Sequence, residues 1–389
     1  MSLRHVLFLT LSSTVLTLVG CSVLDPSLIA GGEDSGVDSA TGEDSGPGID
    51  AGNGMDGCDD GSRRPPPRPT IEDSDGPEVI FALKEVRLIQ MGEAWREIGF
   101  NLDRLCSEAP APLVECLPPA FPDASPLIDG NQGIDNAFGG QLTPLIDIVF
   151  PDLADSAVSA AEEGIGVVIT RIRGWNGEAN DPRVDVTVTQ SVDSTRGAAG
   201  DSAPTAEFRD FRAMMPGTDT DLAEPVWDGN DWVWAREETF FLGDPEQPRV
   251  RDDNAYIANN ELVVTLPDRV EIVFANTAAG LLVRLSDALA VGRISDDRTR
   301  MTPATFAGRW SILDLLDTAN TVGVCEGDTE FDLLRNQLNT IADVRSVAGT
   351  GGEGVSCDAI SLGVTFEGYR VRIAGLTPGQ IPPDGCSDE

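Results

Sequence analysis

Beyond residue 79, hydrophobic and polar residues alternate along the chain in short runs. Within residues 183–190, Val184, Val186 and Val188 stand at every second position with polar residues between them. This period of two is typical of a β-strand with one buried and one solvated face. Similar runs recur about every 8–12 residues, a spacing typical of antiparallel sandwiches and barrels. Strands are expected at 79–90, 94–103, 165–173, 183–190, 232–241, 261–266, 269–275, 281–286, 289–294, 362–366 and 369–373.

Helical spacing replaces this alternation in three places. Apolar residues recur at steps of three and four across 329–345, which predicts a helix there. Shorter helices are expected over 152–163, with an aspartate as its cap, and over 312–320. Segments 106–144, rich in proline, and 194–225, rich in polar residues, are expected to be irregular. The chain from 79 to 389 is therefore predicted to be one large, mainly β domain with a few inserted helices.

The N-terminus carries an apolar run, residues 6–19, after the single positive charge of Arg4. This layout is that of a secretory signal peptide, and the run is shorter than the roughly 20 residues of a membrane span. Leu18-Val19-Gly20-Cys21 resembles the lipobox of bacterial lipoproteins. The resemblance implies cleavage of residues 1–20, acylation of Cys21, and, because Ser22 follows, residence in the outer membrane of a Gram-negative bacterium. The alternative is an ordinary secretory signal in which Cys21 is a stray thiol.

Between the anchor and the domain, residues 21–78 have the composition of a linker. Glycine, aspartate and serine dominate, and the pentamer Gly-Glu-Asp-Ser-Gly occurs at 32–36 and again at 42–46. Such a segment has too little apolar surface to offset the entropy of ordering, so we expect disorder. Residues 63–69 contain four prolines and are expected to form a stiff polyproline II spacer.

Charge and composition exclude several classes of function. The formal net charge is −38, which argues against nucleic acid because a phosphate backbone requires a basic face. The only histidine is His5, inside the expected signal peptide, so histidine-dependent hydrolysis and histidine-ligated zinc are excluded from the mature chain. Lys84 follows no glycine-rich loop and is expected to face solvent from a strand. No cofactor is required by any motif.

Seven cysteines are present, and acylation of Cys21 leaves an even number for an oxidising compartment. We expect three disulfides. Proximity in the sequence favours Cys106–Cys116 and Cys325–Cys357, which leaves Cys58 to pair with Cys386.

One loop has the residue types of a calcium site. Asp129, Asn131, Asp135 and Asn136 surround glycines, and hard oxygen ligands at such spacing suit Ca²⁺. The spacing departs from that of an EF-hand. The alternative is a turn whose aspartate and asparagine side chains bond their own backbone.

Tryptophans in polar loops are candidates for sugar binding, because an indole face packs on sugar C–H groups and nearby amides and carboxylates bind hydroxyls. Packing in the core or in a hairpin is the alternative for each tryptophan. The candidate residues are Trp175, Asn180, Asp181, Trp227, Asp228, Asn230, Asp231 and Trp232.

The strand spacing and tryptophan-bearing loops resemble the concanavalin-like and laminin-G-like jelly rolls of exported lectins and glycanases. The resemblance implies an antiparallel β-sandwich. We therefore expect a non-enzymatic cell-envelope lipoprotein that binds a glycan or another envelope protein. The alternative is a carbohydrate-active hydrolase, which needs only two suitably spaced carboxylates and no histidine.

Overall fold

The computed structural model describes Cys58 and residues 61–386 apart from 72–74, 85–86, 89, 91, 108–113, 120–126, 145, 147–152, 205–221, 276–279 and 380–384. The predicted signal peptide, Cys21 and the first part of the predicted linker lie outside the described residues, so those predictions stay predictions.

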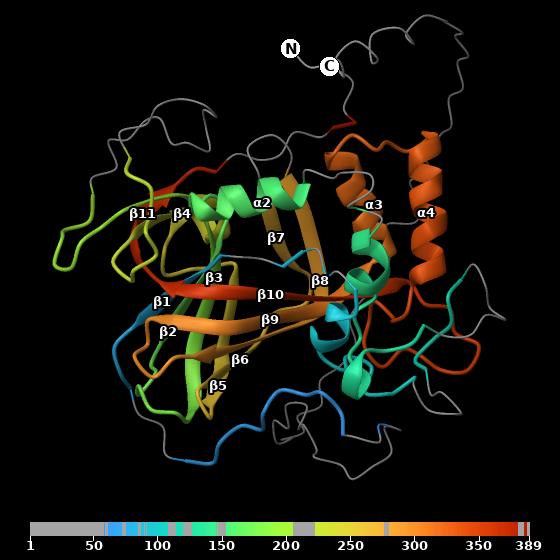
Figure 1. Ribbon diagram of the computed structural model, residues 1–389, viewed down its shortest axis with the longest axis horizontal. Coiled ribbons are helices and arrows are strands. Elements are labelled where there is room, and N and C mark those ends of the chain that lie inside the picture. The colour runs from blue at the N-terminus through green and yellow to red at the C-terminus, as the bar shows by residue number, and fades with distance from the viewer. Residues whose placement is uncertain are drawn as a thin grey trace, which may run out of the picture. The chain divides into compact units, whose positions relative to one another are not determined.

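Eight antiparallel strands close into a barrel (Figure 1). The ring runs from β1 through β10, β9, β8, β6 and β5 to β3, and β3 returns through β2 to β1. Closure gives each of these strands a hydrogen-bonded neighbour on both sides, which removes free sheet edges from the ring. The strands are β1 (Val79–Lys84), β2 (Val168–Arg173), β3 (Asp181–Thr195), β5 (Val250–Ala258), β6 (Glu261–Thr265), β8 (Gly280–Ile294), β9 (Arg300–Ser311) and β10 (Ala359–Arg370).

Two of the barrel strands, β3 and β8, extend beyond the ring and pair with further strands. The last residues of β3 pair with β4 (Trp232–Arg236), and β11 (Arg372–Thr377) lies parallel to β4. The first residues of β8 pair with β7 (Val270–Ala275), whereas its second half pairs with β6 and β9. One end of the barrel is therefore bounded by the strand segments where β3 and β8 leave the ring.

The interior of the barrel is filled with apolar side chains. Val184, Val186 and Val188 of β3 are all buried, as their alternation predicts, and share one core with Phe81 and Trp310. A second apolar cluster lies on the outer face of β1 and β2, where Ala82 and Ile169 pack against β4.

Lys84 lies beside this second cluster. The sequence predicted that it would face solvent, and this prediction is wrong. It is 4% exposed, and its Nζ lies 2.6 Å from a carboxylate oxygen of Glu162. The same Nζ lies 5.2 Å from the ring centroids of Trp227 and Tyr369. A buried ammonium needs such partners because desolvation of an unpaired charge is costly. The contact links β1 to α2 (Leu153–Glu162).

The expectation of a mainly β, antiparallel domain with a few helices is confirmed, but the sheet closes on itself as a barrel and does not form the expected sandwich. The difference has a physical reason. Alternation along a strand shows that one face is buried, and a second sheet or the far wall of the same sheet satisfies that pattern equally.

In the described part of the chain, three α-helices follow the predicted segments. They are α2, α3 (Ile312–Thr321) and α4 (Thr329–Ile341), and the Ser311 side chain caps α3 by accepting a hydrogen bond from the backbone N–H of Asp314. Among the described residues, no helix has both the length and the apolar character needed to span a membrane.

Several strand predictions differ from the structure. Residues 94–97 form a 3₁₀ turn, η3 (Ala94–Glu97), where a strand was expected. The strands expected at 281–286 and 289–294 are one continuous strand with a register shift, and β5 and β9 were not predicted. The expected strand 232–241 ends at Arg236, where the turn η6 (Glu237–Thr239) begins.

Residues 61–71, which the composition assigns to the linker, lie against the barrel. The backbone of Arg63 exchanges hydrogen bonds with Gln132 and Asn101 at 2.9 Å. The Arg68 guanidinium lies 4.5 Å from the ring centroid of Tyr256, whose hydroxyl donates to the carbonyl of Pro66 at 2.6 Å. The stiff proline segment therefore covers an apolar patch on the outer face of β5 and β6 that includes Tyr256.

All six remaining cysteines are paired, as expected, but each expected pairing is wrong. The disulfides are Cys58–Cys106, Cys116–Cys357 and Cys325–Cys386. Proximity in the sequence failed because the barrel brings distant segments together: Leu117 forms a β-bridge with Ser356, which places Cys116 beside Cys357.

Candidate functional site

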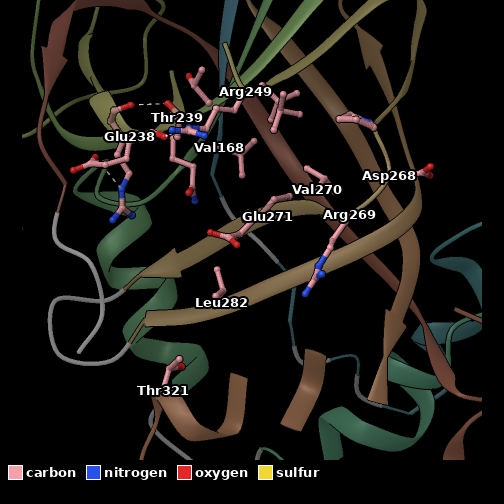
Figure 2. A pocket seen from close by; sticks show the side chains of 17 residues that line it. Val168, Glu238, Thr239, Arg249, Asp268, Arg269, Val270, Glu271, Leu282 and Thr321 are labelled. Carbon is pink, nitrogen blue, oxygen red and sulfur yellow. Dashed lines mark hydrogen bonds and ion pairs between the residues drawn. The ribbon is translucent and has the colours of Figure 1, made fainter. Parts of the chain in front are cut away.

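An open cavity of about 670 Å³ lies at the end of the barrel where β3 and β8 leave the ring (Figure 2). Here Val188 of β3 pairs with Val250 of β5, and Gln190 pairs with Val168 of β2. Its other walls come from the β6–β7 connection, from β7 and β8, and from the end of α3. Both its volume and its position at a barrel mouth are usual for ligand sites. We refer to it as the end cavity.

The floor of the end cavity is aliphatic. Because β-branched side chains favour strands, the same residues that build the sheet give the cavity its apolar surface. Val250 and Leu282 are only half-buried, so they leave apolar surface open to the cavity. Sequence reasoning could not separate these residues from ordinary core positions, since both show the same alternation. The aliphatic lining residues are Val168, Val188, Val250, Val270, Ile272 and Leu282.

The rim of the end cavity carries three arginines and three carboxylates, so its formal charges balance. Figure 2 places Glu238 and Thr239 on one side of Val168 and places Asp268 and Arg269 on the other side. The rim residues are Arg236, Glu238, Arg249, Asp268, Arg269 and Glu271.

Most of these rim charges have partners within the protein. The Nε of Arg236 lies 3.4 Å from a carboxylate oxygen of Glu238, and the Nε of Arg249 donates to the carbonyl of Glu238 at 2.8 Å. Outside the cavity lining, Arg284 pairs with Glu271 at 3.1 Å. The rim is thus polar but electrically neutral, which suits a ligand whose polar end has no net charge.

The carboxylates of the end cavity do not resemble the pair that a glycosidase needs. Glu238 also accepts a hydrogen bond from the backbone N–H of Gly379 at 2.9 Å, and Glu271 is held by arginine. A glycosidase acid has a raised pKa. Among the described residues, the carboxyl groups whose pKa is raised line other parts of the protein; they are Asp103, Asp135, Asp231, Asp252 and Asp343.

The first predicted sugar-binding loop is a packed turn. Trp175 is 2% exposed, and its indole N–H donates to the carbonyl of Glu178 at 2.9 Å. Asp181 is fully buried and accepts a hydrogen bond from the backbone N–H of Asn176 at 2.8 Å. The side-chain oxygen of Asn180 accepts the backbone N–H of Asn259. These side chains have structural partners, and the indole offers no open face to a sugar.

The second predicted loop divides between the core and the surface. Trp227 is 9% exposed, and its indole N–H donates to the carbonyl of Glu162 at 3.1 Å. Asp231 is fully buried; one of its carboxylate oxygens accepts the backbone N–H of Trp227, and burial raises the pKa of this carboxyl group. Asp228 and Asn230 bond each other in an exposed turn. Of the three predicted tryptophans, only Trp232 remains partly exposed.

The predicted calcium loop does not bring its four residues together. Asn131 donates to the carboxylate of Glu97, and the Asn136 amide donates to the carbonyl of Ile98 at 2.8 Å. Asp129 and Asp135 do line one small enclosed cavity of about 10 Å³. In the described part of the chain, no group of three or more acidic, cysteine or histidine side chains is positioned to hold a metal ion.

That small cavity is instead lined by an acidic cluster, Asp103, Asp129, Asp135 and Asp343, of which Asp135 is buried and the others are half-buried. Burial raises the pKa of Asp343 to about 7, although the Ser361 side chain and backbone both donate to its carboxylate. Burial, reinforced by the neighbouring carboxylates, also raises the pKa of Asp135 well above its usual range. Sequence reasoning identified two members but missed Asp103 and Asp343, which no local motif connects to the loop.

Comparison of the chain with protein-family models, with curated proteins and with solved structures gives no match.

Proposed function

We propose that the protein is a non-enzymatic binding protein of the cell envelope, held by a lipid on Cys21, whose end cavity takes up a small amphipathic molecule. The observation that carries the proposal is the pairing of an aliphatic floor with a charge-balanced rim in one cavity of about 670 Å³. An apolar group fits the floor formed by Val168, Val250 and Leu282. A polar group that is uncharged or zwitterionic fits the rim.

The chemistry of this lining favours an amphipathic ligand over a plain glycan. A sugar presents hydroxyl groups on most sides, and an aliphatic floor leaves those groups without hydrogen-bond partners. The tryptophans expected to stack on sugars do not line this cavity. An alkyl chain, in contrast, gains about 0.8 kcal/mol for each buried methylene group.

A series of single-chain probes tests the proposal. Octyl-, decyl- and dodecylphosphocholine are titrated into the full chain below their micelle concentrations, with maltotriose as the sugar comparison. The proposal predicts that affinity rises about fourfold for each added methylene, until the floor is filled, and that maltotriose binds more weakly. Affinity independent of chain length would contradict it. Tighter binding of maltotriose would favour the glycan alternative.

A further inference from the structure

A second hollow lies on the outside of the barrel, between the outer face of β1 to β3 and strand β11. Its volume is about 500 Å³, and it shares only Thr189 with the end cavity. We refer to it as the outer cleft. Its apolar lining comes from Ile80, Phe240, Val371, Ile373 and Leu376, and its polar lining comes from Glu78, Arg171, Thr187, Trp232, Glu246, Arg370 and Arg372.

Arg171, which lines this cleft, and its neighbour Arg173 are neutralised by glutamates. Glu78 accepts from the Nε atoms of Arg171 and Arg173, and Glu246 accepts two hydrogen bonds from Arg173 at 2.8 and 2.9 Å. The hydrogen bond from Arg173 and its positive charge lower the pKa of Glu246, which keeps that carboxylate ionised. Two positive and two negative charges therefore cancel on this side of the cleft.

Arg370 and Arg372 are not neutralised in this way. The guanidinium of Arg372 donates to the carbonyls of Asn230 and Ala198, which are uncharged partners. Arg370 is exposed, and no carboxylate within the described ranges pairs with it. The cleft thus concentrates two uncompensated positive charges in a chain whose formal net charge is −38. Arginine pairs are well suited to carboxylates because the planar guanidinium binds both oxygens.

Trp232 adds an aromatic surface to the same cleft. The guanidinium carbon of Arg372 lies 3.9 Å from the ring centroid of Trp232, and the carbonyl contacts of Arg372 fix the guanidinium in that position. Arg372 covers one face of the indole, while the exposed part of Trp232 and the exposed guanidinium of Arg370 line the same cleft and match the two ends of an acidic sugar. The C–H face of such a sugar packs on an aromatic ring, and the carboxylate of the sugar binds arginine. Thr187 and Thr189 form the polar floor of the cleft, where both are buried.

We propose that the outer cleft binds a carboxylated saccharide, with the sugar ring against the exposed part of Trp232 and the carboxylate at Arg370, and with Arg372 adding its positive charge nearby. This site is separate from the end cavity, so it does not depend on the amphipathic ligand proposed for that cavity.

Calorimetric titration of the full chain with trigalacturonate tests the proposal, with maltotriose as a neutral trisaccharide and citrate as a carboxylate without a sugar ring. We expect trigalacturonate to bind at least about tenfold more tightly than either, and more weakly as salt is added. Equal binding of maltotriose would overturn the role of the charge. Equal binding of citrate would overturn the role of the sugar ring.

The variant Arg370→Gln locates the binding. Arg370 is exposed, so the substitution leaves the fold intact, and the loss of one charge-assisted contact is expected to weaken trigalacturonate about tenfold. Arg293→Gln is the matched control, since Arg293 is an exposed arginine on β8 outside the cleft, paired with Glu261. Equal affinity of the two variants would overturn the proposed site. Binding of dodecylphosphocholine at the end cavity is expected to be unchanged in both variants.

Discussion

The acidic cluster and the end cavity both contain carboxylates, but these carboxylates differ in their burial and in their partners. In the cluster, Asp103, Asp135 and Asp343 line a small cavity of about 10 Å³, and burial raises the pKa of each carboxyl group. The end cavity holds Glu238 and Glu271 at an open rim beside arginines. Carboxylates that are buried together couple protonation to folding. Ion pairs at an open rim contribute little to folding stability, about 0–1 kcal/mol.

The largest expected effect comes from removing the cation that borders the acidic cluster. Arg309 is 1% exposed, and its guanidinium lies 2.6 Å from the carboxylate of Glu115 and donates to the carbonyl of Leu102 at 2.7 Å. Arg309→Met leaves Glu115 buried without a cationic partner, although the backbone N–H of Arg345 still donates to it, so the free energy of unfolding should fall by about 3–5 kcal/mol. Denaturant unfolding measures this change.

The control for Arg309→Met is Arg293→Met, which breaks a surface ion pair with Glu261. Surface pairs contribute about 0–1 kcal/mol, so little change is expected. If the free energy of unfolding fell by a similar amount in the two variants, burial would not determine how much each ion pair contributes to stability.

The second effect is a pH dependence of stability that originates in the cluster. The folded-state pKa of Asp343 is about 7, above its ordinary value of 3.8, so the folded state retains a proton that the unfolded state has released. The free energy of unfolding therefore falls as pH rises from about 4 to about 7, by on the order of 4 kcal/mol in total. Asp343→Asn should remove that part of the pH dependence. Unfolding curves at several pH values check this, and an unchanged slope in the variant would refute it.

A smaller effect is expected from the disulfide Cys325–Cys386. It joins two cysteines that are 61 residues apart in the sequence, and neither cysteine lines the cavity of the acidic cluster. Replacing both cysteines by serine should lower the free energy of unfolding by about 2–4 kcal/mol, because the unfolded chain gains conformational freedom. The pH dependence caused by Asp343 should persist in this variant. Loss of that dependence would indicate that the disulfide and the cluster form one cooperative unit.

The smallest effect on stability is expected at the rim of the end cavity. Glu271→Gln removes a half-exposed charge whose partner Arg284 also pairs with Asp317. The change in unfolding free energy should stay within about 1 kcal/mol. Calorimetric melting checks this change. If Glu271→Gln lowered the unfolding free energy as much as Arg309→Met, charges at the rim would matter as much for stability as those beside the acidic cluster.

Local patterns predicted the parts of this fold that depend on local physics. The steps of three and four across 329–345 predicted α4, and the alternating valines 184, 186 and 188 predicted β3. Closure of the barrel and the disulfide pairing were not predictable in this way, because both depend on which distant strands meet. Asp343 joins Asp135 only through the tertiary fold, and the burial of Trp175 is decided by its neighbours and not by its own loop.

The claim that the end cavity is the binding site is tested most directly by the affinity of dodecylphosphocholine for two variants of the full chain. Leu282→Gln places an amide on the aliphatic floor, whereas Leu313→Gln makes the same change at an exposed position outside the cavity lining. We expect Leu282→Gln to weaken binding about tenfold and Leu313→Gln to bind like the unchanged protein. Equal affinities in the two variants would contradict the claim.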